Sequence, residues 1–263
     1  MSHKTPIIFS IILLTIIIFC LIMFLVTYLC GGKISLIHIG ERNSKVIYDK
    51  DFSLEDVKNI EIKQDMGNVI VKEATNDKIQ VIAYGEKEED IKVDFNHDKL
   101  AIDGTIQKRI TFFSFGNVKN DMIIYIPSSY SNEIKITNDL GNCEISNLEN
   151  VALLDIDCDA GNVEANKIKN AKIKCEMGEV KIQEIKNQCD IAVDAGNVDI
   201  SKLSIQEDSN IKADLGNIEI SEINDIYIEA QVDLGKTNIN GSNRDSDVTL
   251  KIQCDCGDIK VGK

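Results

Sequence analysis

Acidic residues followed two positions later by glycine are the best candidates for chemistry in this chain. Eight such copies share one sequence context, and seven of them begin after residue 138. The candidate acids of the second half are Asp139, Asp159, Glu176, Asp194, Asp214 and Asp233. Stacked about 5 Å apart, their carboxylates would repel one another. A cation such as Ca²⁺ could settle between them, because this ion prefers carboxylate and carbonyl oxygens.

A structural role is the alternative for the same residues. Most copies read Asp-x-Gly-Asn, in which the carboxylate can accept hydrogen bonds from its own turn amides and the asparagines can form a ladder beside it. The ladder asparagines are Asn68, Asn142, Asn162, Asn197 and Asn217. The calcium-binding nonapeptide roll has paired glycines every nine residues, and this chain lacks that repeat. We therefore expect the acids to stabilise turns, and cation binding is the second hypothesis.

The glycine of each copy predicts a turn whose third residue has a positive φ, which glycine adopts without strain. These turn glycines are Gly67, Gly141, Gly161, Gly178, Gly196, Gly216, Gly235 and Gly257. From Gly141 onward they are 20, 17, 18, 20, 19 and 22 residues apart. A period of this length is typical of stacked supersecondary units.

The residues around each glycine predict short strands. In the clearest copy, Ile211, Ala213 and Leu215 are spaced two apart, as are Ile218 and Ile220. Each run therefore has one apolar and one polar face. A unit this short cannot bury its apolar face alone, so successive units must stack with equivalent strands paired in parallel.

The predicted fold is all-β throughout the soluble part of the chain. Residues 133–263 are predicted to form a parallel β-solenoid of about seven coils. Residues 56–132 are less regular: alternating runs such as 78–84 and 99–103 predict antiparallel strand excursions that interrupt a first coil at Asp65.

One apolar segment near the amino terminus predicts a membrane anchor. Pro6 to Leu29 is 24 residues without a charged side chain, which is long enough for a helix to cross the hydrocarbon layer. We predict a short tail at 1–5, a transmembrane helix at 6–30 and a juxtamembrane linker at 31–55. A cleavable signal peptide is the alternative, but its apolar core is normally shorter.

Orientation in the cell membrane is less strongly encoded. Lys4 precedes the segment, whereas Lys33, Arg42 and Lys45 follow it, and this distribution leans towards a cytoplasmic main domain. Long domains after a single helix translocate regardless of such small differences. We expect a single-pass protein whose main domain is extracytoplasmic.

Composition excludes some classes of function. A net charge of −14 without a basic stripe disfavours nucleic-acid binding. The chain has no tryptophan and three histidines, and no nucleophile or phosphate-binding motif is present, so we expect no catalytic residues and no cofactor. Cys158, Cys175 and Cys254 occupy positions where other copies have valine or alanine, which predicts core packing rather than a metal site.

The anchor, the Asp-x-Gly-Asn units and the apolar run from Met122 to Pro127 resemble a bacterial β-strand-repeat family named "putative adhesin". This family has no known function and includes LiaG-like envelope proteins. The resemblance covers residues 55–263 and implies a right-handed β-solenoid on a membrane protein, with no established catalytic residues. The cysteine-rich units depart from the valine or serine that is usual there.

These observations predict a membrane-anchored, acidic, non-catalytic binding or scaffold module of the cell envelope, either adhesin-like or an accessory to envelope-stress signalling. The alternatives are a β-helix enzyme acting on wall polysaccharide and a passive spacer. An envelope protein or a wall polymer is the expected partner. Self-association is also expected, through the solenoid edge that we assign to residues 245–263, because an uncapped solenoid edge tends to pair.

Overall fold

The computed structural model describes residues 33–35, 38–39, 45–105, 109–111, 114–115 and 120–262. The predicted membrane helix at 6–30 lies outside them, as does the tail before it. Within the described residues, no helix combines the length and the hydropathy that crossing a membrane requires.

The chain divides into two compact units. The smaller unit comprises residues 1–42 and 106–117. It contains two short parallel strand pairs, which join β1 (Lys33–Ser35) to β9 (Arg109–Thr111) and β2 (His38–Ile39) to β10 (Ser114–Phe115). The larger unit comprises residues 43–105 and 118–263 and contains all the glycine corners.

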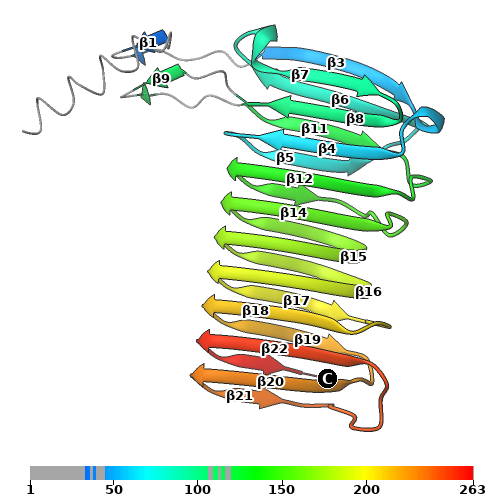
Figure 1. Cartoon of the computed structure of the whole chain (residues 1–263), viewed down its shortest axis with the longest axis vertical. Helices are drawn as coiled ribbons and strands as arrows, with labels where there is room; N and C mark the ends of the chain where they lie inside the picture. Colours follow the sequence, from blue (N-terminus) through cyan, green and yellow to red (C-terminus); the bar gives the residue numbers. More distant parts are fainter. Residues whose placement is uncertain are drawn as a thin grey trace, which may run out of the picture. The chain divides into compact units, whose positions relative to one another are not determined.

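The larger unit is all-β, and most of it is a stack of coils (Figure 1). Each coil is a strand, a glycine corner and a second strand, and we call the whole assembly the coil stack. The strands before the corners are β4 (Asn59–Gln64), β12 (Glu133–Leu140), β14 (Leu153–Ala160), the ends of β15 (Val163–Met177) and β16 (Val180–Ala195), β18 (Ser209–Leu215), β20 (Tyr227–Leu234) and β22 (Thr249–Cys256). The strands after the corners are β5 (Val69–Glu73), β13 (Cys143–Ile145), the starts of β15 and β16, β17 (Val198–Leu203), β19 (Ile218–Ile223), β21 (Thr237–Ile239) and β23 (Ile259–Val261).

Neighbouring coils pair in parallel with equivalent residues aligned, so inward side chains form columns. In seven successive coils, one column consists of isoleucines: Ile62, Ile136, Ile156, Ile173, Ile191, Ile211 and Ile252. Every member is buried. Each buried isoleucine contributes about 1.5–3 kcal/mol relative to an exposed one, which is why the alternating pattern specifies the stack.

Antiparallel strands close the end of the stack that comes first in the sequence. On one side, β8 (Lys99–Gly104) pairs with β4 and with β7 (Lys92–Asn96). On the other side, β11 (Met122–Ile126) pairs with β5 and with β6 (Lys78–Gly85). β6 pairs in turn with β3 (Lys45–Ser53). Two short 3-10 turns, Leu54–Asp56 and Glu88–Asp90, connect these strands. β3 lies within the predicted linker at 31–55, where charged residues hide the strand pattern.

The last two coils are stacked out of sequence order. β22 pairs with β18 on one side and with β20 on the other, and β23 likewise lies between β19 and β21. Figure 1 shows β22, in red, between β18 and β20. The edge of the stack is therefore formed by β20 and β21, and the expectation that residues 245–263 form it is wrong. The connection at 240–248 passes the edge coil, so that β22 and β23 lie inside the stack.

Candidate binding ridge along the glycine corners

The glycine corners are joined from coil to coil by backbone hydrogen bonds. Except in the edge coil, the glycine of each corner donates its N–H to the carbonyl of the residue before the next glycine in the stack, as Gly161 does to Met177 at 2.9 Å. The residue two after the glycine also donates to the next coil, as Val163 does to Glu179 at 2.9 Å. All eight corner glycines have positive φ values between 126° and 157°.

Asparagine side chains add a second set of links between corners. Asn142 donates its backbone N–H to the side-chain oxygen of Asn68 at 2.9 Å, and Asn162 donates to Asn142 at 3.0 Å. Asn217 bonds to Asn197 in the same way. The series is interrupted only at Glu179, whose side chain accepts no such bond from the next coil within the described residues.

Two aspartates extend this ladder, and our sequence interpretation did not include either of them. Asp258 accepts a hydrogen bond from the backbone of Lys236 at 2.8 Å and donates its own N–H to Asn217. At the other end, Asp121 accepts from the backbone of Asn68 at 3.1 Å. Asp258 occupies the asparagine position of its copy and was visible as such, whereas Asp121 belongs to no copy and gives no sequence signal.

The predicted site acids do align into a column, but their expected contacts differ. The residues on either side of Asp139, Asp159, Glu176, Asp194 and Asp214 pair in register from coil to coil. In stacking order, Asp255 lies between Asp214 and Asp233, because the last two coils are stacked in the reverse of their sequence order.

Two of these carboxylates pair with lysine side chains two residues earlier instead of binding their own turn amides. Glu176 pairs with Lys174 at 2.9 Å and Asp214 with Lys212 at 2.6 Å. The corner amides are already used in the bonds between coils, which explains why the expected Asx-turn bonds do not form. In residues 120–262, no hydrogen bond joins any of the five acids Asp139 to Asp214 to its own turn.

Like charges along the column affect one of its acids, Asp159. Partial burial first, and then the neighbouring carboxylates of Glu176 and Asp139, raise the pKa of Asp159 above its usual range. Within the part of the chain that the structure describes, no three Cys, His, Asp or Glu side chains converge as metal ligands do.

The residue between the acid and the glycine forms an exposed apolar stripe, which we call the corner ridge. Its members in stacking order are Met66, Leu140, Ala160, Met177, Ala195, Leu215, Cys256 and Leu234. Its five large members are 50–70% exposed, and they are five of the seven large apolar side chains exposed in the described residues.

The corner ridge corrects one sequence interpretation. The two-residue spacing of Leu215 with Ala213 predicts that both side chains point inward, but Leu215 is 59% exposed. The strand has already reached the corner at Leu215, beyond the edge of the core. The signal that could have identified the ridge is that the residue between acid and glycine is apolar in all eight copies.

Thiols lie directly behind the corners. Cys158 and Cys175 are aligned neighbours, both are buried, and their sulfur atoms lie 3.7 and 3.5 Å from the carbonyl oxygen of Gly161. The pKa of Cys158 is raised to about 12, first by its hydrogen bond with Cys143. Such thiols are protonated at neutral pH and serve as small core residues that donate to corner carbonyls.

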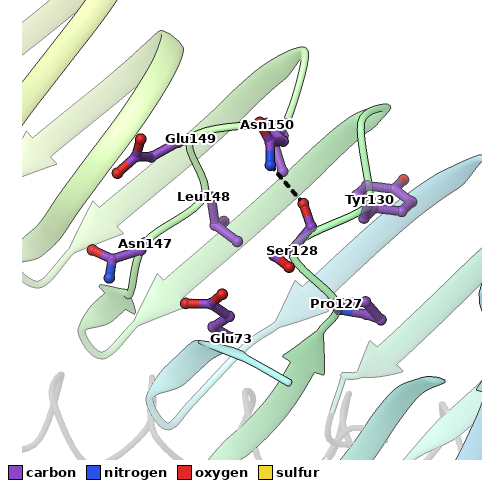
Figure 2. A pocket seen from close by; sticks show the side chains of 9 residues that line it. Glu73, Pro127, Ser128, Tyr130, Asn147, Leu148, Glu149 and Asn150 are labelled. Atoms are coloured by element: carbon purple, nitrogen blue, oxygen red, sulfur yellow. Dashed lines mark hydrogen bonds between the residues drawn. The ribbon is translucent and has the colours of Figure 1, made fainter. Parts of the chain in front are cut away.

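A shallow depression lies on the side of the coil stack away from these corners (Figure 2). It measures about 180 Å³, and Glu73, Tyr130 and Glu149 are among its lining residues. Two of its polar side chains are bound to the protein itself: the Tyr130 hydroxyl donates to the backbone at 2.8–2.9 Å, and Asn150 donates to the Ser128 carbonyl at 2.7 Å. Ligand pockets are usually about 300–1,000 Å³, so this depression is the weaker candidate site.

Lysines neutralise the acid at the rim of this depression. Glu149 forms ion pairs with Lys186 and with Lys167, the latter at 3.7 Å. The hydrogen bond from Lys186 is the main cause that lowers the pKa of Glu149. Glu149 and Lys186 also line a second, open depression of about 360 Å³, together with Lys169 and Gln206 among others.

The sequence of this chain matches the model of the Toastrack DUF4097 family over residues 57–263. The chain therefore belongs to this family. The match includes all eight glycine corners and most of the closing strands.

Solved structures with a similar arrangement share little sequence with this chain. A "putative adhesin" from Bacteroides fragilis is 16% identical, with 85% of this chain and 100% of that chain covered and a TM-score of 0.46. A "putative adhesin" from Parabacteroides distasonis is 9% identical, with 84% and 98% covered and a TM-score of 0.47. A "putative lipid binding protein" from the same species is 11% identical, with 88% and 100% covered and a TM-score of 0.45. No curated protein matches the sequence.

Proposed function

We propose that the coil stack is a right-handed β-solenoid that serves as a non-catalytic binding module of the bacterial cell envelope. In this proposal residues 6–30 anchor it in the cell membrane with the main domain outside. Its binding surface is the corner ridge. The observation that carries the proposal is the concentration of exposed large apolar side chains at one position of successive coils.

Exposure of this kind needs an explanation. Scattered apolar residues are normal on a surface, but a continuous apolar stripe usually marks an interaction site. Stacking at about 4.8 Å per coil extends the corner ridge over roughly 34 Å. Polar residues would satisfy the corner geometry equally well, because the hydrogen bonds between corners use the backbone and the asparagines. The apolar side chains are therefore available for a partner.

The acids beside the corner ridge indicate what kind of partner binds. Each apolar member follows an acidic residue, and lysine pairing compensates only part of that charge. A partner with apolar groups and positive charge would complement both features, whereas an anionic polymer would need bridging cations. An envelope protein with a basic, partly apolar surface fits best.

The names of similar solved structures are compatible with this proposal. Relatives by structure bear names that refer to adhesion, and one to lipid binding. An adhesin-like role or an accessory role in envelope-stress signalling is compatible with a binding ridge. A passive spacer would not need exposed leucine and methionine at the corners.

The test is co-sedimentation of the full-length, detergent-purified protein with isolated cell envelopes of its source organism. The double variant Met177→Gln, Leu215→Gln removes the centre of the corner ridge and is expected to reduce binding at least tenfold. Val46→Gln is the matched control, because Val46 is 49% exposed but lies on β3, away from the corners. Equal binding of all three proteins, or no binding by the wild type, would refute the proposal.

The enzymatic alternative has its own test. Asp194→Asn and Asp214→Asn should abolish turnover of a wall polysaccharide if the acids act in catalysis. Both acids lie on the exposed column, so neither substitution disturbs the core. We expect no turnover by the wild type, and turnover that is lost in both variants would replace the binding proposal with an enzymatic one.

A further inference from the structure

The end of the coil stack at β20 and β21 leaves part of the core open. On the adjacent strand β22, Leu250, Ile252 and Cys254 are buried to 2% exposure or less. Their aligned partners on β20 are Ile228, Ala230 and Val232, and of these only Ile228 is buried. Beyond them, Leu234 is 70% exposed and is the most exposed large apolar residue in the described part of the chain.

The opposite end of the stack is closed. There the edge strands β3 and β7 carry Phe52 and Phe95, whose rings lie 6.2 Å apart between centroids, and Phe52 packs against the core. Charged side chains, including Lys50 and Asp51, also lie on β3. Charged residues and covering strands are the usual means of protecting a sheet edge. The open end at β20 and β21 has no covering strand, as Figure 1 shows for the last arrows of the stack.

The connection at 240–248 covers only the beginning of β20. The Ser242 hydroxyl accepts a hydrogen bond from the backbone N–H of Ile228 at 3.0 Å. Asn243 donates its backbone N–H to the Ile226 carbonyl at 2.8 Å. The protection ends there, since neither Ala230 nor Val232 receives a bond from this connection among the described residues.

The direction of the free backbone groups follows from the bonds that are made. Tyr227 donates its N–H to Val248 and so faces the inner coil, whereas Ile228 donates to Ser242 on the open side. In a parallel ladder this alternation continues along the strand. Ala230 and Val232 therefore direct their N–H and C=O groups outward. On β21, Asn240 donates to Val261, so Thr237 and Ile239 direct theirs outward by the same alternation.

We propose that this end binds a second copy of the chain, with β20 pairing antiparallel to β20 and β21 to β21 about a two-fold axis. The axis would run between the two copies of Val232 and between the two copies of Asn238, and each of these residues is three positions from the corner glycine Gly235. Both strands can therefore pair at once. The exposed Leu234 would then face Ala230 of the second copy, and the two cores would become continuous.

Charge favours this register and this occupant. Gln231 lies opposite Asp233 of the second copy, to which its amide can donate, and Glu229 lies opposite Gly235. Like charges directly opposite each other on antiparallel strands are destabilising, and this register contains no such pair. The inward side chains of Ala230 and Val232 are half-exposed and small enough to let the β20 edges of two copies approach each other. A charged inward residue, which would prevent such pairing, is absent from β20.

The experiment measures the mass of the full-length protein in detergent and disulfide cross-linking in native membranes. Val232→Cys is made in a Cys256→Ser background, because Cys256 is exposed. Directly opposite residues of antiparallel strands have α-carbons about 5.5 Å apart, which a disulfide can span. Glu229→Cys is the matched control on the same strand, since its α-carbon would lie about 20 Å from its symmetry mate.

We expect a dimer whose Val232→Cys cross-link is at least tenfold more abundant than that of Glu229→Cys. Val232→Lys places a charge on the two-fold axis. Because Val232 is half-exposed, we expect this variant to remain folded, as judged by circular dichroism, and to be a monomer. A wild-type monomer at all accessible concentrations would overturn the proposal. So would equal cross-linking at both positions, or a cross-linked product whose mass shows a different protein.

Discussion

A Cβ atom on Gly216 would overlap the carbonyl oxygen of Gly196, because the two glycines lie one directly above the other in adjacent coils. The same relationship joins each corner glycine to the one before it in the stack, up to the exchanged pair Gly257 and Gly235. The corners therefore approach one another more closely than any side chain would allow. Close approach and positive φ both require glycine at this position.

Replacing a corner glycine should destabilise the coil stack. Gly216→Ala places a methyl group against backbone that is held in two ladders, and Gly216 has a φ of 148°. The strained backbone and the overlap together predict a loss of about 2–4 kcal/mol. Urea unfolding followed by far-UV circular dichroism measures this loss as a lower midpoint.

Gly85→Ala is the control for this substitution. Gly85 does not have a positive φ, and a methyl group there would meet the flexible end of Ile47 rather than backbone. We expect a change of less than about 1 kcal/mol, because a flexible side chain can move aside. Equal losses in the two variants would contradict the role assigned to the corners.

The asparagine ladder should be measurable at a single link. Asn142→Ala removes the acceptor for the backbone N–H of Asn162. A hydrogen bond of this kind contributes about 1 kcal/mol, so the amide of Asn162 should exchange with solvent about fivefold faster. Hydrogen exchange read by NMR or mass spectrometry is preferable to global unfolding, since repeat stacks can unfold in parts.

Two further variants test whether the effect is specific to the ladder. Asn142→Asp keeps an acceptor oxygen, as Asp258 does naturally, and should restore most of the protection of Asn162. Asn147→Ala removes an asparagine whose side chain makes no hydrogen bond to the described residues, and should leave exchange unchanged. If Asn147→Ala lost protection of the Asn162 amide and Asn142→Ala did not, the ladder would be excluded as the cause.

Local sequence patterns were sufficient to predict the strands and corners. The predicted runs 78–84 and 99–103 correspond to β6 and β8, and alternation at Ile211 and Ile218 correctly placed their side chains in the core. These features depend on residues close in sequence: a period-two apolar pattern and a glycine with a special backbone conformation. The family resemblance is confirmed by the match to the Toastrack family.

The features that the sequence did not reveal depend on contacts between distant residues. The order of β20 and β22 depends on the pairing of β18 with β22, which joins residues far apart in the sequence, such as Ile211 and Ile252. The exposure of Leu215 depends on where the core ends. The corner acids lack their expected turn bonds because the amides are taken by the neighbouring coils. Cation binding by the candidate acids stays a prediction from the sequence.

The six cysteines that the structure describes should differ sharply in reactivity. Cys256 is exposed at the corner ridge, whereas Cys158, Cys175, Cys189 and Cys254 are buried. Burial is the main cause that raises the pKa of Cys189 to about 12. Since the thiolate is the reactive form, maleimide at pH 7.5 should label Cys256 at least a hundredfold faster than the buried thiols.

Peptide mapping by mass spectrometry distinguishes the sites, including Cys20 and Cys30, which lie outside the described residues. Cys256→Ser should remove the fast label from the coil stack, and unfolding in urea should expose all the others. Rapid labelling of Cys158 in the folded protein would show that the stack opens at this corner.

The acidic column should make stability depend on pH through Asp159. Its pKa is raised in the folded protein, so between the ordinary value of about 3.9 and the raised value the folded state binds more protons than the unfolded state. Stability therefore falls as pH rises through this window. At pH 7 the ionised Asp159 costs stability, and Asp159→Asn should recover about 0.5 kcal/mol after allowance for screening by solvent.

The difference between Asp159→Asn and wild type should disappear below pH 3, where the carboxyl is protonated in both states, and should shrink in 1 M NaCl to the part that burial causes. Asp77→Asn removes the same charge from an exposed turn outside the column and should change stability little at any pH. Thermal unfolding at pH 3, 5 and 7 provides the measurement. A destabilising effect of Asp159→Asn at pH 7 would mean that the carboxylate holds its corner together instead of repelling its neighbours.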